Sequence, residues 1–121
     1  MNNLMLARNA YNSSTTVFRT ARDTELEAFR RVTHRLRASN PKSSYADFCA
    51  ALNDNRSLWN TIAADVADDQ NELPNLLRAQ IFYLAEFTEL QTSKILRGQA
   101  DAQALISINA AVMRGLETGT K

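Results

Sequence analysis

The residues that break helices or carry most enzyme chemistry are rare in this sequence. Its 121 residues include three glycines, two prolines, one cysteine and one histidine. No glycine precedes Gly98, which excludes the glycine-rich loops that bind nucleotide phosphates. One cysteine and one histidine are too few ligands for a zinc site. We therefore expect a protein that is not an enzyme and that binds no metal or other cofactor.

Cysteine pairs and long apolar runs are missing too. Cys49 has no second cysteine with which to form an internal disulfide, which favours a reducing compartment. No apolar run approaches the ~18 residues of a membrane span, and the N-terminal residues lack the charged start and apolar stretch of a signal peptide. We expect a cytoplasmic protein without membrane insertion. The composition, 45% hydrophobic and 22% charged, fits one globular domain over residues 1–121.

Helical periodicity predicts an all-α fold. No segment alternates apolar and polar residues as a half-buried strand would. The apolar spacing predicts five helices with short connections, which is typical of a compact, mostly antiparallel bundle. The expected helices cover residues 2–12, 23–39, 44–68, 71–97 and 101–116, with a Ser/Thr-rich connection over 13–22. Pro74 suits the first turn of the fourth helix, and Gly98 suits its C-terminal cap.

The fourth helix has the most apolar sequence. Its stretch RAQIFYLAEF, residues 78–87, holds seven apolar residues in ten. At about 100° per residue the apolar positions form two adjoining stripes. One stripe consists of Leu76, Tyr83, Phe87 and Leu90, and the other of Leu77, Ile81, Leu84 and Ile95. Two stripes suit a helix that packs against several neighbours, so we expect the fourth helix to be central and largely buried.

Phe82 does not fit this interpretation, because it lies in the polar sector of the same helix. Either the N-terminal segment covers Phe82, or Phe82 docks against a partner protein. In the second case Arg78, which lies beside it, can pair with an acid of the partner. Arg56 and Arg114 are further candidates for partner binding, since each is a basic residue next to an apolar stripe.

Two asparagines interrupt stripes that are otherwise apolar. Asn55 lies between Phe48 and Trp59, and Asn109 lies in the stripe of the last helix. A buried amide without a partner costs about 1–3 kcal/mol, so each asparagine needs a specific hydrogen bond. Such residues fix the register between helices, or they bind the backbone of a peptide.

Positive charge is concentrated in the first third of the chain. Residues 1–42 hold eight Lys or Arg residues against three acids, whereas the remainder holds six against ten. In the helix expected over 23–39, the inner face is formed by apolar residues, Leu26, Phe29, Val32 and Leu36. Its outer face carries Arg30, Arg31, Arg35 and Arg37. These arginines either solvate a helix face or contact RNA. The face has no interleaved aromatic residues for stacking on bases, which disfavours RNA as a partner.

Four strings resemble the flagellar biosynthesis regulator FlaF of α-proteobacteria. They are NAYNSS, RDTELEAFRRVTHRL, ALNDNRSLWNTIAADVADDQNELPNLLRAQIFYLAEFT and INAAVMRGL, and together they cover nearly the full length in this order. The resemblance implies a small helical cytoplasmic protein that promotes flagellin synthesis and secretion. It implies action as a flagellin-binding adaptor or export chaperone, in balance with a second regulator that represses flagellin translation.

The resemblance also implies partners. Flagellin would offer its amphipathic terminal helices, which a helix-binding surface can cover, and the flagellar export apparatus is a further implied partner. Two alternatives remain open from the residues. One is an RNA-directed post-transcriptional regulator of flagellin expression that uses the basic second helix. The other is a structural subunit that acts through contacts between copies of itself.

Overall fold

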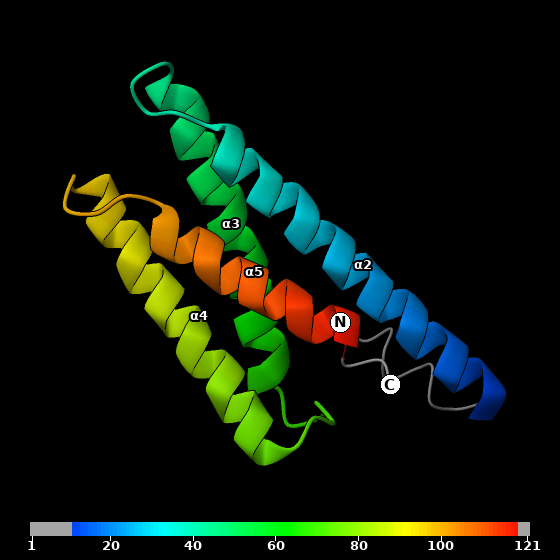
Figure 1. The fold of residues 1–121 in the computed structure, drawn as a ribbon. Coiled ribbons are helices and arrows are strands. Elements are labelled where there is room, and N and C mark those ends of the chain that lie inside the picture. Colours follow the sequence, from blue (N-terminus) through cyan, green and yellow to red (C-terminus); the bar gives the residue numbers. More distant parts are fainter. Residues whose placement is uncertain (1–10, 119–121) are drawn as a thin grey trace.

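The structure is a computed structural model that describes the backbone of residues 11–118 and the side chains of residues 25–115. The described chain is helical and contains no strand, so the prediction of an all-α fold is confirmed (Figure 1). The helices are α2 (Tyr11–Ala38), α3 (Tyr45–Ala67), α4 (Asn75–Leu96) and α5 (Gln103–Thr118). The helix expected over 2–12 lies almost entirely outside the described residues, so the count of five is not confirmed.

The expected connection over 13–22 is wrong, because α2 runs without interruption from Tyr11 to Ala38. The segment contains no glycine or proline. Serine and threonine are only modestly poorer helix formers than leucine or arginine, so nothing in the segment stops a helix that has already begun. A polar composition was read as a break where the sequence has no breaking residue.

The other helix boundaries follow local signals in the sequence. The Ser44 hydroxyl caps the start of α3 by accepting a hydrogen bond from the Asp47 N–H at 3.2 Å. Pro74 immediately precedes α4, and Gly98 follows its end with a φ of 75°, a backbone conformation that favours glycine. The Asp101 carboxylate accepts a hydrogen bond from the Gln103 N–H at the start of α5, at 3.0 Å.

α3 lies between α2 and α4 and packs against both of them. α5 packs along α2, whereas it meets α4 mainly near the 97–102 connection and diverges from α4 beyond it (Figure 1). α2 and α4 are not in contact with each other. α4 is therefore an edge helix, supported chiefly by α3.

The core is formed mainly by the faces that α2, α3 and α5 turn toward one another, and α4 adds Ala85 and Ile95 to it. The inner face of α2 carries the apolar residues that its periodicity predicted: Leu26, Phe29, Val32 and Leu36 are all buried. Phe29 packs edge-to-face on Trp59 of α3, with ring centroids 5.7 Å apart. Leu52 of α3 and Leu105 of α5 are almost completely buried beside Leu36.

The two core asparagines bind each other. The Asn109 amide nitrogen donates to Asn55 Oδ1 at 2.8 Å, and the Trp59 indole N–H donates to Asn109 Oδ1 at 2.9 Å. Both asparagine side chains are fully buried. The prediction that each needs a specific partner is confirmed. Because the bonds join α3 to α5 across the bundle, a shift of either helix along its axis would break them, which fixes their register.

The prediction of a central, largely buried fourth helix is wrong. The buried residues of α4 are Ala85, Thr88, Thr92 and Ile95. The stripe assigned to the core instead faces water, with Leu76 72% exposed and Leu90 64% exposed.

Small side chains explain this orientation. A face of alanine and threonine lets α4 approach α3 closely. Its hydroxyls need no outside partner, because Thr88 donates to the Ala85 carbonyl and Thr92 donates to the Thr88 carbonyl, each at 2.7 Å. The buried face of α4 therefore consists of small side chains and Ile95, whereas large side chains such as Leu76, Tyr83 and Leu90 remain exposed.

Candidate functional site

The outward side of α4 carries a row of residues at the spacing of a helix-pairing seam. Leu76, Tyr83 and Leu90 are seven residues apart, and Gln80, Phe87 and Lys94 alternate with them at intervals of three and four. We call these six residues the α4 outer face. An average spacing of about 3.5 residues is that of an apolar seam between two helices. The row lies opposite the buried residues Ala85 and Thr92, so it points away from the bundle.

The α4 outer face is the main exposed apolar surface of the described chain. Nine large hydrophobic residues are exposed between residues 25 and 115, and eight of them lie between 73 and 96. These eight are Leu73, Leu76, Leu77, Phe82, Tyr83, Phe87, Leu90 and Leu96. Single exposed apolar residues are normal on a protein surface. A group concentrated on one helix and the residue just before it is typical of an interaction site.

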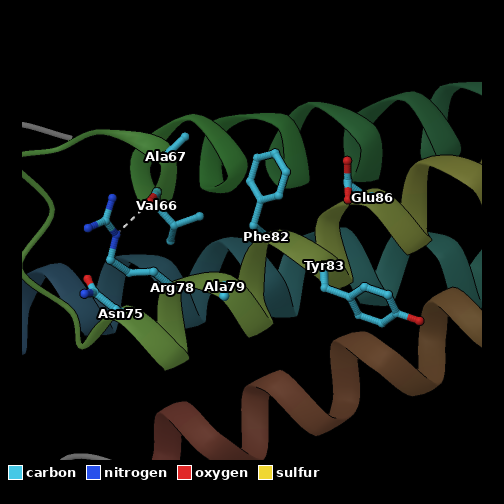
Figure 2. Close-up of a pocket in the computed structure, with 8 residues that line it drawn as sticks. All are labelled: Val66, Ala67, Asn75, Arg78, Ala79, Phe82, Tyr83 and Glu86. Atoms are coloured by element: carbon cyan, nitrogen blue, oxygen red, sulfur yellow. Dashed lines mark hydrogen bonds between the residues drawn. The ribbon is translucent and has the colours of Figure 1, made fainter.

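Phe82 lies at the edge of this surface and is 39% exposed. Figure 2 shows its ring pointing toward α3, whereas Tyr83 leaves the other side of α4. Phe82 and Tyr83 line an open hollow of about 510 Å³ together with Val66 and Ala67 at the end of α3. The ring is thus accessible in part. The side chains of the N-terminal segment suggested to cover it lie outside the described residues.

Arg78 binds the end of α3. Its Nε donates to the Val66 carbonyl at 2.8 Å (Figure 2), and its Nη2 donates to the Asp68 carbonyl at 2.9 Å. Val66 lies in the last turn of α3 and Asp68 is its C-terminal cap. Carbonyl groups at the end of a helix have no hydrogen-bond donor within the helix, and the helix dipole favours a positive charge there. The structure brings Arg78 next to Phe82, as the sequence suggested. Its guanidinium, however, is engaged in joining α4 to α3.

Arg56 and Arg114 lie apart from this pair. Arg56 forms a two-pronged ion pair with Glu89, with N–O distances of 3.1 and 2.8 Å, which also joins α3 to α4. Arg114 lies near the C-terminal end of α5, the part of that helix that diverges from α4 (Figure 1). The four predicted site residues therefore do not form one cluster.

A family model described as flagellar protein FlaF matches residues 7–116. The chain belongs to the FlaF family. The match covers nearly the whole chain, including all of α2, α3 and α4 and almost all of α5. It identifies a flagellum-related protein and confirms the resemblance found in the sequence. No curated protein and no solved structure matches this FlaF-family chain.

Sequence reasoning missed the exposure of the outer face in this FlaF-family protein, although it had identified most of the residues. Leu76, Tyr83, Phe87 and Leu90 were grouped correctly as one stripe and then assigned to the core. The informative signal was a second row of small residues, Ala85, Thr88 and Thr92, on the opposite side of the helix. A row of small residues at helical spacing allows close helix packing, which marks the buried side.

Other kinds of site find no support in the described part of this FlaF-family protein. Between residues 25 and 115, whose side chains the structure describes, no three His, Cys, Asp or Glu side chains come together in a way that could hold a metal ion. None of the helices described here combines the length and apolar character that a membrane crossing requires.

Proposed function

We propose that this FlaF-family protein binds flagellin in the cytoplasm as an adaptor or export chaperone, and in this way promotes flagellin synthesis and secretion. The observation that supports this most is the α4 outer face, an exposed apolar row at helix-pairing spacing on an edge helix. Its chemistry fits an amphipathic helix that lays its own apolar stripe along α4. Membership in a family of flagellar proteins supports flagellin, with its amphipathic terminal helices, as the source of that helix.

The outer face has the side chains that such binding needs. Tyr83 is 66% exposed and Phe87 36% exposed. Aromatic residues of this kind are enriched among the residues that dominate binding energy. Burying one large apolar side chain contributes about 1.5–3 kcal/mol before the entropy lost on association is counted. A helix that covered the whole row would hide its own stripe from water until the export apparatus receives it.

Arg78 and Arg56 would act indirectly in this proposal. Arg78 joins α4 to α3 by hydrogen bonds to the end of α3, and Arg56 does so by its ion pair with Glu89. They fix the position of the helix that carries the binding row. Phe82 would extend the row around the edge of α4 toward Val66.

Removing two exposed side chains tests the proposal. Tyr83→Ala combined with Leu90→Ala should weaken flagellin binding, measured by calorimetry, by at least ~2 kcal/mol, the usual threshold for a dominant contact. Leu96→Ala is the matched control, since Leu96 is also an exposed leucine of α4 but lies off the row. If both variants bind flagellin as the unmodified protein does, the outer face is not the site.

Phe82→Ala resolves the role of the neighbouring ring. If Phe82 contacts flagellin, the substitution should weaken binding and leave the melting temperature nearly unchanged, because the ring is already partly exposed. If the N-terminal segment covers Phe82 instead, the substitution should lower the melting temperature while the folded protein binds normally. Measuring melting and affinity on the same sample separates the two roles.

A further inference from the structure

We propose that two copies of this protein pair through their α4 outer faces in antiparallel orientation when flagellin is absent, so that flagellin must displace a second copy to bind. The pairing itself is argued from the described residues alone. Only the displacement by flagellin rests on the proposed function.

The spacing of the row is compatible with its own reversed copy. In an antiparallel pair centred between Gln80 and Tyr83, Leu76 of one copy lies opposite Phe87 of the other. Gln80 then lies opposite Tyr83, where its amide can bond the phenol hydroxyl. Leu90 faces Leu73, which is 37% exposed just before α4. In each of these opposed pairs, one residue comes from the set Leu76, Tyr83 and Leu90, and the other comes from the set at the alternating positions. This is the pairing that an antiparallel seam between two helices requires.

The charges at the two ends of α4 select the antiparallel orientation. Asp68, Asp69 and Glu72 precede the helix and are exposed, whereas Lys94 and Arg97 are exposed at its other end. A parallel pair would place acids beside acids and bases beside bases. An antiparallel pair places the acidic end of one copy beside the basic end of the other and also opposes the two helix dipoles. The surface is therefore complementary in charge to a second copy of itself.

The apolar area is sufficient for a reversible dimer. Leu73, Leu76, Tyr83, Phe87 and Leu90 together expose on the order of 500 Å² of apolar surface. Two such surfaces would bury roughly 1,000 Å², near the lower limit of specific interfaces. A dimer of this size is weak enough for a competing helix to displace. The edge position of α4 leaves its outward side clear of the other described helices.

Sedimentation velocity on the full chain alone tests the pairing. The protein should pass from monomer to dimer as its concentration rises. Leu76→Glu combined with Phe87→Glu should weaken the dimer at least tenfold. Helical content, and melting at a concentration where the monomer predominates, should stay unchanged, because both positions are exposed. Leu96→Glu, off the row, should leave the dimer intact. A protein that stays monomeric at the highest concentration, or a dimer equally weakened by Leu96→Glu, overturns the proposal.

Disulfide cross-linking tests the orientation, in a Cys49→Ser background. Leu76→Cys and Phe87→Cys should each fail to cross-link alone, because copies of the same residue would lie roughly 16 Å apart along the pair, far beyond disulfide reach. A mixture of the two variants should cross-link readily. Cross-linking of either variant with itself in preference to the mixture would indicate a parallel pair and contradict the proposed arrangement.

Charge reversal provides a test with a built-in rescue. Lys94→Glu with Arg97→Glu should weaken the dimer at least tenfold at low salt. Adding Asp69→Lys and Glu72→Lys to the same chain should restore it, since the two ends are then complementary again. If the variant with all four substitutions dimerises no better than the double variant, the charged ends of α4 do not contact each other in the dimer, which contradicts the proposed orientation.

Adding flagellin separates this inference from the proposed function. Conversion of the dimer to a complex with one copy of each protein supports both. A monomeric protein that binds flagellin overturns the pairing and leaves the proposed function intact. A dimer that does not bind flagellin retains the pairing alone, and a dimer that binds flagellin without dissociating places flagellin on another surface.

Discussion

α2 and α4 both pack against α3, yet they turn opposite kinds of residue toward water. α2 buries large apolar side chains such as Phe29 and Leu36 and exposes arginines. α4 buries Ala85, Thr88 and Thr92 and exposes Leu76, Tyr83 and Leu90. Hydrophobicity alone would assign the larger residues of both helices to the core. The comparison shows that the fit between neighbouring helices decides which face is buried, and that apolar residues left outside are available for another molecule.

The inner face of α2 should show the largest effect on stability. Phe29→Ala removes a ring that is 2% exposed and packs on Trp59. We expect it to lower the free energy of unfolding by about 3–5 kcal/mol, measured by urea denaturation followed by circular dichroism. A loss no larger than that caused by substitutions on the α4 outer face would contradict the contrast between the two helices.

A larger side chain on the inner face of α4 should lower the stability of the protein. Ala85 is 7% exposed and belongs to the cluster that contains Phe29 and Trp59. Ala85→Leu adds apolar surface but forces α4 away from α3, so we expect it to cost about 1–3 kcal/mol of stability. Ala79→Leu is the control, since Ala79 is exposed on the same helix. If Ala85→Leu stabilises the protein in thermal melts, close helix approach does not set the orientation of α4.

The outer face of α4 should contribute little to stability. Leu76 is 72% exposed and Tyr83 66% exposed, so Leu76→Ser with Tyr83→Ser should change the free energy of unfolding by only about 0.5 kcal/mol or less. Unfolding is best measured at a protein concentration low enough for the monomer to predominate, because loss of a dimer would otherwise contribute. A loss of several kcal/mol in the monomer would mean that part of the chain covers this face.

Substitutions on the outer face of α2 should change stability and binding less than the substitutions on the other three faces. Arg31 and Arg37 are exposed, whereas Arg35 pairs with Asp54 of α3 and is therefore left unchanged. Arg31→Ala with Arg37→Ala should leave melting and flagellin binding as they were, and RNA retention should be negligible with or without the change. Salt-sensitive binding of a flagellin leader RNA that this double substitution abolishes would favour the RNA-directed alternative instead.

The sequence predicted those parts of the fold whose signals are local. Ser44, Pro74 and Gly98 act within a few residues of themselves, and the helix boundaries near them were predicted to within a few positions. The inner face of α2 was predicted correctly because its apolar residues form one stripe. Asn55 and Asn109 were expected to have partners on physical grounds, but their bonding to each other depends on how α3 and α5 pack.

The candidate site was predicted less well, because it depends on contacts between helices. Phe82 was identified as an anomaly, and its partial exposure is consistent with either role proposed for it. Arg78 was assigned to a partner because its target, the carbonyl of Val66 twelve residues earlier, becomes apparent only when α4 folds back on α3. The apolar row of α4 was identified, but α4 has two apolar stripes, and periodicity cannot rank them without knowing the shape of the neighbouring helix.

The hydroxyl groups of Thr88 and Thr92 have a consequence for the motion of α4. Both donate to carbonyls of their own helix, so these bonds persist if α4 moves away from α3. Detachment therefore leaves neither threonine hydroxyl unpaired. It costs the packing of Ala85 and Ile95 and the bonds of Arg56 and Arg78. Amide hydrogens of α4 should therefore exchange with deuterium sooner than those in the middle of α3, through openings that leave the Asn55–Asn109 bond intact.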